Sequence, residues 1–415
     1  MTRGTRTYRR PVLVDEFLVA WRSRRRDRGA FGKMEGMHVE TVRHAIDSGW
    51  SAALPTSLDS ERTLVLVFGA PEYVDRPEVI AELRAAFPRA CLLGCSSAGE
   101  IYGNKVYDSS LAVAVASFEH TALRLASASI GDASGSYAAG EAIARALVDD
   151  SLRGVHVLSE GIRVNGTELV RGINSIVADD VVVTGGLAGD GDRFGRTWVV
   201  ADGRPVSDTI TAVGFYGDHV CIGHGSKGGW DPFGPTRMVT RSEGNVLYEL
   251  DSTPALELYE RYLGDRAAGL PATGLLFPLA MDRDGSDRRV VRTILAVNRE
   301  AQSLTFAGDI PVGARVQLMK ANFDRLVEGA EEAGELAHER GGDGGPSLAI
   351  AVSCVGRRLV LGERTEEEVE ATLEALPEGV AQIGFYSYGE LSPHKGASCD
   401  LHNQTMTITT IRELD

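Results

Sequence analysis

Cysteine, aromatic residues and long hydrophobic runs are all scarce in this sequence. Aromatic residues make up 7% of the 415 positions, and the five cysteines are Cys91, Cys95, Cys221, Cys354 and Cys399. No two cysteines have the CxxC spacing of a structural zinc site, and their scatter is typical of a reducing compartment. The longest apolar stretches, such as residues 111–118, are far shorter than the ~20 residues of a membrane span. We therefore predict a cytoplasmic protein without a membrane span or a structural zinc ion.

Positive charge is also scarce once the first 33 residues are set aside. The net charge is −15, yet residues 1–33 hold ten Arg or Lys against three acidic residues, which leaves −22 on the rest. An acidic body repels phosphate backbones, so we exclude nucleic acid as the main partner. Residues 1–36 lack the apolar core of a secretory signal, and Met34 and Met37 stand just before the first regular pattern. We predict a basic N-terminal extension that is disordered or that precedes the true start.

Apolar strand patterns alternate with helical patterns from residue 63 onwards. Strand-like runs at 64–68 and 90–95 flank a helical pattern at 77–87, which indicates a β-α-β unit. The same order recurs within 155–184 and within 348–386. This alternation predicts the α/β class in its mixed α+β form, with helices that flank mixed sheets.

Several local patterns make narrower predictions. Residues 38–48 have helical spacing, and the period-two runs at 111–118 and 122–127 are close enough to form a hairpin. Thr365 and Glu368 have the spacing of a capping box.

One loop sequence occurs twice without a gap and a third time in looser form. GCSSAGEI at 94–101 aligns with GFYSYGEL at 384–391, and GGLAGDG at 185–191 again places small residues before an acid. Each loop directly follows an apolar strand, at the end of the sheet where open α/β proteins bind ligands. We therefore expect the three loops to converge on one water-filled pocket.

The chemistry of these loops favours an amine or a zwitterion as the ligand. Glycine allows a ligand to approach the backbone, and serine adds hydroxyl groups. Glycine-rich loops often hold phosphate, but the acid in each loop would repel it. The alternative is that the glycines form turns and the acids cap them locally. The predicted ligand-binding residues of the loops are Gly94, Cys95, Ser96, Ser97, Gly99, Glu100, Gly185, Gly186, Gly189, Asp190, Tyr386, Ser387, Gly389 and Glu390.

Known catalytic motifs do not fit the chain. Residues 94–99 are one residue too long for the nucleophile elbow, and the glycines within 189–195 are one residue off the dinucleotide fingerprint. Cys95 lies beside Glu100 without nearby basic residues, a setting that does not activate a thiol. We predict that the protein is not an enzyme. A hydrolase or transferase that uses Cys95 or Ser97 is the weakest alternative.

Two histidines are alternative ligands for haem. His224 lies at the end of a strand pattern, and His402 lies near His394 and Cys399. A lone histidine is more often a hydrogen-bonded structural residue. We therefore predict no metal site and no cofactor, and we keep haem bound by His402 or His224 as the alternative.

Several motifs in a fixed order make the chain resemble the FIST-domain proteins, prokaryotic sensory proteins with an N-terminal and a C-terminal FIST part. The motifs span about residues 38 to 412. They are GCSSAGEIYG at 94–103, GGLAGDGDRFGRTWVV at 185–200, the run from 239 to 264, FAGDIP at 306–311 and GFYSYGELSP at 384–393. The resemblance implies a sensor that binds a small molecule such as an amino acid and passes a signal to a kinase, a cyclic-nucleotide enzyme or a chemotaxis component. Some relatives bind haem and sense nitric oxide.

Residues and resemblance together predict two pseudo-duplicated units, a FIST N-like domain at 37–240 and a FIST C-like domain at 241–415. The predicted function is a sensor for an amino acid or a similar small polar metabolite, with Arg292 as a bidentate partner of the ligand carboxylate. The expected partner is a separate signalling protein such as a kinase or a cyclic-di-nucleotide enzyme. The alternative is a haem-binding nitric-oxide sensor that acts on the same kinds of partner.

Overall fold

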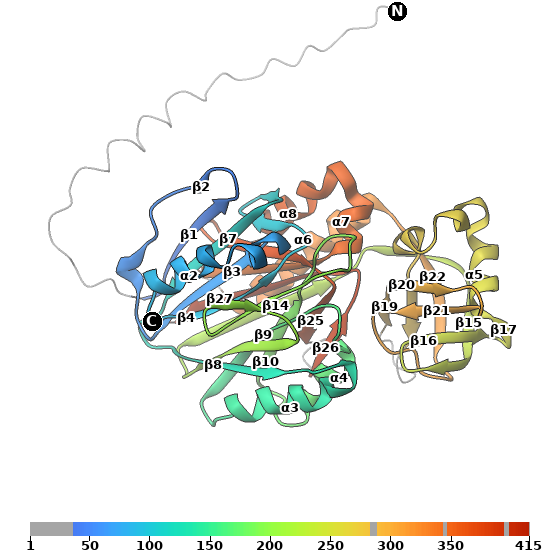
Figure 1. Cartoon of the computed structure of the whole chain (residues 1–415), viewed down its shortest axis with the longest axis horizontal. Coiled ribbons are helices and arrows are strands. Elements are labelled where there is room, and N and C mark those ends of the chain that lie inside the picture. The colour runs from blue at the N-terminus through green and yellow to red at the C-terminus, as the bar shows by residue number, and fades with distance from the viewer. Residues whose placement is uncertain (1–35, 283–288, 343–346, 394–397, 415) are drawn as a thin grey trace, which may run out of the picture. The chain divides into compact units, whose positions relative to one another are not determined.

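The computed structural model describes residues 36–282, 289–342, 347–393 and 398–414 (Figure 1). These residues form mixed β-sheets with flanking helices, which confirms the predicted mixed α/β class. Apart from Gly36, the predicted basic extension lies outside them. Within the described ranges, no helix is both long enough and apolar enough to cross a membrane.

The first sheet contains a parallel strand pair joined by helix α2 (Pro77–Ala86). Its seven strands, in spatial order, are β12 (Arg204–Val206), β11 (Val199–Ala201), β4 (Cys91–Ser96), β3 (Thr63–Gly69), β7 (Ser110–Ser117), β1 (His38–Ala45) and β2 (Gly49–Trp50). Every residue of β3 is buried, which explains why its sequence is an almost continuous apolar run.

The second sheet repeats this plan around the parallel pair β9 and β10. Its strands, in spatial order, are β26 (Cys399–His402), β25 (Gly389–Pro393), β10 (Val182–Leu187), β9 (Leu152–Ser159), β13 (Thr209–Tyr216) and β8 (Ala122–Ser129). Helix α3 (Ser136–Leu147) connects β8 to β9, and helix α4 (Gly166–Asn174) connects β9 to β10. Asn165 caps α4, because its side chain accepts hydrogen bonds from the Thr167 and Glu168 amides.

The third sheet is built in the same way around the parallel pair β23 and β24. Its strands, in spatial order, are β14 (Val220–Lys227), β27 (Met406–Glu413), β23 (Ser347–Cys354), β24 (Ala381–Ser387), β5 (Glu100–Tyr102) and β6 (Lys105–Tyr107). Helix α6 (Phe323–Gly341) precedes β23, and helices α7 (Val355–Leu361) and α8 (Thr365–Glu374) connect β23 to β24.

A fourth, antiparallel sheet is inserted between β14 and α6 and has its own apolar core. Helix α5 (Ala255–Leu263) packs within this core. The strands are β19 (Arg289–Arg292), β18 (Leu279–Asp282), β22 (Arg315–Ala321), β15 (Trp230–Glu243), β16 (Val246–Leu250), β21 (Ser303–Phe306) and β20 (Ile294–Asn298), with β17 (Thr253–Pro254) paired to β16. Short 3-10 helices among the described residues of all parts of the chain are Thr56–Leu58, Pro71–Asp75, Ala133–Gly135, Gly264–Gly269, Ala272–Leu276 and Gly362–Arg364.

The first three sheets exchange hairpins in a cycle. The hairpin β5–β6 follows β4 of the first sheet but pairs with β24 of the third. The hairpin β25–β26 follows β24 of the third sheet but pairs with β10 of the second. The hairpin β11–β12 follows β10 of the second sheet but pairs with β4 of the first. Hydrogen-bonded strands therefore interlock the two halves of the chain, and the predicted division at residue 240 stays a prediction.

Two local predictions about strands are wrong. Residues 38–48 do not form a helix: they contain strand β1, whose Val42 and His44 are buried at the two-residue spacing of a strand. Strands β7 and β8 do not form a hairpin, although they follow one another in the chain. Each pairs within its own sheet instead, β7 with β3 and β8 with β13.

Candidate functional site

The three glycine-rich loops lie together, each at the end of the second parallel strand of its sheet. In each loop, one backbone N–H donates a hydrogen bond to a carbonyl of another loop, so the three bonds close a ring. The bonds run from Ala98 N to Tyr386 O (2.8 Å), from Tyr388 N to Leu187 O (3.1 Å) and from Gly189 N to Ser96 O (3.1 Å). Main-chain bonds therefore hold each loop against the other two.

Glycine is needed in these loops because neighbouring backbones pass very close. A Cβ atom on Gly185 would lie 1.9 Å from the Val157 carbonyl oxygen, and φ of Gly185 is +142°, a conformation that side chains other than glycine rarely adopt. The other small or aromatic loop residues that we predicted as ligand contacts are also buried, namely Gly94, Cys95, Ser96, Ser97, Gly99, Gly186, Gly189, Tyr386, Ser387 and Gly389.

The two loop glutamates are buried and are hydrogen-bonded within the protein. Glu100 Oε2 accepts from the amide (3.1 Å) and the hydroxyl (2.9 Å) of Ser110. Glu390 Oε2 accepts from the amide (3.2 Å) and the hydroxyl (2.9 Å) of Thr405, and its Oε1 accepts from Ser387 Oγ at 2.6 Å. Burial raises the pKa of Glu100 well above its ordinary value and raises the pKa of Glu390 to about 8. Each glutamate ties its loop to the strand that follows the exchanged hairpin.

Asp190 of the second loop is also buried and hydrogen-bonded, but its partners lie before the exchanged hairpin and in the third loop. Its Oδ2 accepts from the amides of Gly195 (2.8 Å) and Arg196 (2.7 Å), and the Tyr388 hydroxyl donates to its Oδ1. These bonds agree with the alternative that the loop acids act as local caps. Contact of the three loops with a ligand stays a prediction.

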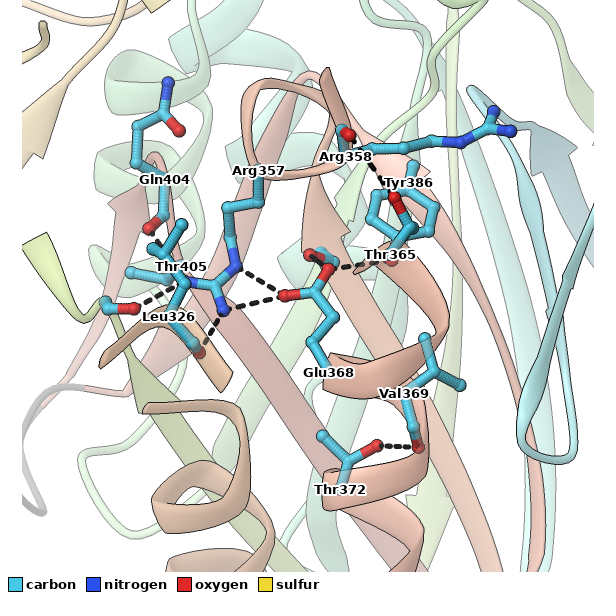
Figure 2. Close-up of polar contacts among 12 residues, drawn as sticks. Leu326, Arg357, Arg358, Thr365, Glu368, Val369, Thr372, Tyr386, Gln404 and Thr405 are labelled. Atoms are coloured by element: carbon cyan, nitrogen blue, oxygen red, sulfur yellow. Dashed lines mark hydrogen bonds and ion pairs between the residues drawn. The ribbon is translucent and has the colours of Figure 1, made fainter. Parts of the chain in front are cut away.

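A fully buried ion pair is attached to the third loop through Tyr386 (Figure 2). Arg357 Nε donates to Glu368 Oε2 at 2.9 Å, and Arg357 Nη2 lies 2.7 Å from the same oxygen. Glu368 Oε1 accepts from Tyr386 OH (2.7 Å) and from Ser353 Oγ (3.0 Å). The network therefore connects α7, α8, β23 and the loop in one set of bonds.

Sequence reasoning missed this network because it assigned Glu368 to a capping box. The Thr365 hydroxyl donates to the Gly362 carbonyl instead, and Glu368 is engaged by Arg357. The capping box is thus wrong, because the buried charge of Arg357 needs the carboxylate. The two adjacent arginines, Arg357 and Arg358, within the otherwise apolar segment 355–361 were the available signal.

Arg358, the next residue, connects α7 to the first loop. Its Nη1 donates to the Ala98 carbonyl, and its guanidinium binds both carboxylate oxygens of Asp108 at 2.9 and 2.7 Å. A Cβ atom on Gly99 would lie 2.5 Å from the guanidinium, so glycine leaves the room that Arg358 occupies.

A cavity of about 380 Å³ has positively charged side chains in its wall. Lys227 comes from the end of β14, Arg289 from the start of β19 and Arg340 from the end of α6. The hydroxyls of Ser226 and Thr405 belong to the same wall, and none of the described lining residues is acidic. The volume is in the range of small-molecule sites.

The two histidines that we kept as haem ligands lie in or beside this cavity. His402 lines it, and His402 Nε2 lies 3.0 Å from the Ser392 carbonyl oxygen, to which it donates. Arg340 Nη1 donates to His224 Nδ1 (3.0 Å) and to the His224 carbonyl (2.7 Å). Burial and the charge of Arg340 lower the pKa of His224 to about 4, so its imidazole is neutral. In the described ranges, no group of three or more His, Cys, Asp and Glu side chains is placed to hold a metal ion.

Two bonded paths lead from the cavity wall to the third loop. Thr405 lines the cavity and donates to Glu390, which belongs to the loop. Gly228 also lines the cavity, and its carbonyl accepts from Arg357, the partner of Glu368. The first path is a single hydrogen bond, and the second reaches Tyr386 of the loop through Arg357 and Glu368.

Arg292 is buried, and it joins the inserted sheet to the second sheet. Its Nη1 donates to the carbonyls of Leu401 (3.1 Å) and Val291 (3.2 Å). The bond to Leu401 connects β19 with β26. Pairing of Arg292 with a ligand carboxylate stays a prediction.

Comparisons with known proteins identify two adjacent family segments. The model of the FIST N domain matches residues 63–253, and the model of the FIST C domain matches residues 255–393. No curated protein matches the chain. A crystal structure of cyanuric acid hydrolase from A. caulinodans is similar at a TM-score of 0.32 and 11% identity, covering 91% of this chain and 100% of that one. A likeness this weak carries no argument about activity.

Proposed function

Because the chain belongs to the FIST family, whose domains are sensory domains of signal transduction, we propose that it binds a small polar ligand in the basic cavity. The ligand would change the contacts of the third loop, and a separate signalling protein, such as a kinase or a cyclic-di-nucleotide enzyme, would read that change. The choice of partner rests on the family alone.

The observation that carries this proposal is the cavity with its three cationic side chains. Its volume of about 380 Å³ suits a small metabolite, and its wall is built from segments far apart in the chain. An amino acid or a similar metabolite would present its carboxylate to Arg340, whose planar guanidinium suits bidentate pairing.

Non-enzymatic action is part of the proposal. Burial raises the pKa of the Cys95 thiol well above its ordinary value, so this thiol is not activated as a nucleophile. Ser97 Oγ accepts a hydrogen bond from the Gly99 amide at 2.9 Å, which gives the hydroxyl a structural role in the turn.

Haem, the alternative ligand, does not fit His224 as it lies. The Nδ1 atom of His224 accepts from Arg340, so the lone pair of the neutral ring is already used. A histidine needs a ring nitrogen lone pair directed at the metal to act as a ligand. His402 donates to the Ser392 carbonyl through Nε2, a bond that metal-ligating histidines also make, and the part of the chain that the structure describes places no other His, Cys, Asp or Glu pair with it as a metal site. We therefore derive no function through haem.

A thermal-shift screen of the full chain against amino acids, carboxylic acids and haem tests the proposal. We expect at least one small polar compound to raise Tm, because a ligand at 100 times its Kd stabilises the folded state by about 2.7 kcal/mol. Arg340→Gln should abolish the shift. Arg145→Gln, which changes an exposed arginine of α3, should retain it. A wild-type response in Arg340→Gln, or no response to any polar compound, would overturn the proposal.

A further inference from the structure

We infer that the ligand of the basic cavity is a small anion with at least two negative charges; this inference rests on the proposed function and names its ligand class. It departs from the amine or zwitterion that the loop acids favoured in the sequence. The reason is that those acids are buried and bonded inside the protein, while the cavity presents cations.

The first argument is the balance of charge in the cavity wall. Lys227, Arg289 and Arg340 reach it from three different elements, and no described lining residue is a carboxylate. A zwitterion would place its ammonium group among these cations, with no lining carboxylate to pair with it. A ligand with two anionic groups would place one group at Arg340 and the other at Lys227 or Arg289, each of which also has a carboxylate partner outside the cavity wall.

The second argument is that the three cations are unequally neutralised. Lys227 pairs with Glu332, and Arg289 Nε pairs with Asp282 at 3.0 Å. Among the described residues, no carboxylate lies within ion-pair distance of Arg340, whose bonds go to the imidazole and the carbonyl of His224. We therefore infer that Arg340 is the main contact of the anion. An anionic ligand there would supply the counter-charge that no described residue supplies.

The third argument concerns the neutral groups beside Arg340. Burial and the nearby guanidinium keep His224 neutral, with Nδ1 as an acceptor, so this histidine helps to orient Arg340. Ser226 Oγ accepts from the Thr407 hydroxyl at 3.1 Å, which leaves its own hydrogen for a ligand oxygen. The hydroxyl of Thr405 donates to Glu390 and therefore offers a ligand only its lone pairs.

Two kinds of molecule share this chemistry, a dicarboxylate and a phosphate monoester. Isothermal titration of the full chain with succinate and with glycerol 3-phosphate separates them. Acetate serves as the singly charged comparison and alanine as the zwitterionic one. We expect one dianion to bind at least about tenfold more tightly than both acetate and alanine, since each further charge-assisted contact adds affinity.

Variants locate the binding. Arg340→Gln and, separately, Arg289→Gln should each weaken the dianion at least about tenfold, while Arg145→Gln should not change its affinity. Circular dichroism confirms that each variant is folded, and the second cavity variant keeps the test valid if the first fails to fold.

The outcomes distinguish the inference from the proposed function. If alanine binds as tightly as either dianion and Arg340→Gln weakens its binding, the ligand is not specifically a dianion. That result would overturn the inference and leave the sensor proposal standing. If no probe binds, or if binding ignores both cavity variants, the inference is overturned. If the wider screen also finds no ligand, the sensor proposal falls with it.

Discussion

Replacing Glu368 by glutamine should destabilise the protein by about 3–5 kcal/mol, because it leaves the charge of Arg357 buried without a counter-ion. Both side chains of the pair are 0% exposed. Glutamine keeps the shape of the side chain and an oxygen that accepts from Tyr386 and Ser353. Its NH2 group then replaces the oxygen that accepts from Arg357, so the change removes both the negative charge and that acceptor. The carbonyls that Arg357 also contacts, those of Leu326 and Gly228, cannot neutralise it.

The same chemical change one residue earlier is the matched control. Glu367 pairs with Arg364, and the two side chains are 47% and 39% exposed. Exposed pairs of this kind contribute about 0–1 kcal/mol, so Glu367→Gln should have little effect. Both variants change a glutamate of α8. The pair of Glu367 is exposed, and Arg364 keeps Asp324 as a second carboxylate partner at 2.9 Å.

Urea unfolding followed by circular dichroism at pH 7 measures both free energies. The double variant Arg357→Met with Glu368→Gln should be more stable than the sum of the two single changes, because it removes the isolated charge. The reasoning is refuted if the unfolding free energies of Glu368→Gln and Glu367→Gln differ by less than about 1 kcal/mol. It is also refuted if the loss in the double variant equals the sum of the two single losses.

Two further predictions concern the loops. Burial raises the pKa of Glu390 to about 8 in the folded protein, whereas the unfolded chain has the ordinary, lower pKa. As pH rises, the unfolded chain therefore loses this proton first. The stability that the protonated carboxyl contributes is complete below the unfolded pKa, and it is lost as pH rises towards 8. Glu390→Gln, which cannot ionise, should flatten that fall in unfolding free energy between pH 5 and 8; an unchanged slope would contradict the assignment. Gly185→Ala should cost more than about 2 kcal/mol, because its Cβ would meet the Val157 carbonyl in a glycine-only conformation. Gly131→Ala is the control, because φ of Gly131 is +71° and no atom lies within 4 Å of its added Cβ. This control should lose about 1 kcal/mol of stability. Equal losses of Tm in the two variants would show that close packing at Gly185 is unimportant.

The sequence predicted the elements of the fold better than their partners. The β-α-β order around residues 64–95 is a local pattern, and it appears as β3, α2 and β4. The pairing of β5 with β24 joins segments far apart in the chain, and no periodicity records such a contact. The expected hairpin of β7 and β8 failed for the same reason, since proximity in the chain does not decide which sheet a strand joins.

The candidate site was harder to predict than the fold. Repeated glycines and acids marked the three loops, but the pattern of small residues followed by Glu100 or Glu390 is the same for a ligand contact and for a buried cap. The cavity was missed except for His402, because Lys227, Arg289 and Arg340 lie on three separate elements and each reads as an ordinary surface charge. Only the assembled sheets bring them together.

The exchanged hairpins have a consequence for how this protein is made. Gln382 donates to the Gly103 carbonyl across 279 residues, so the hairpin β5–β6 leaves the ribosome long before its partner strand exists. The second sheet likewise waits for β25 and β26, which follow its strand β13 by more than 170 residues. Unpaired strand edges are prone to aggregation, and non-local pairing is slow. Strand edges of the first-made segments therefore stay open for much of synthesis, and we expect chaperones to raise the folding yield of this protein.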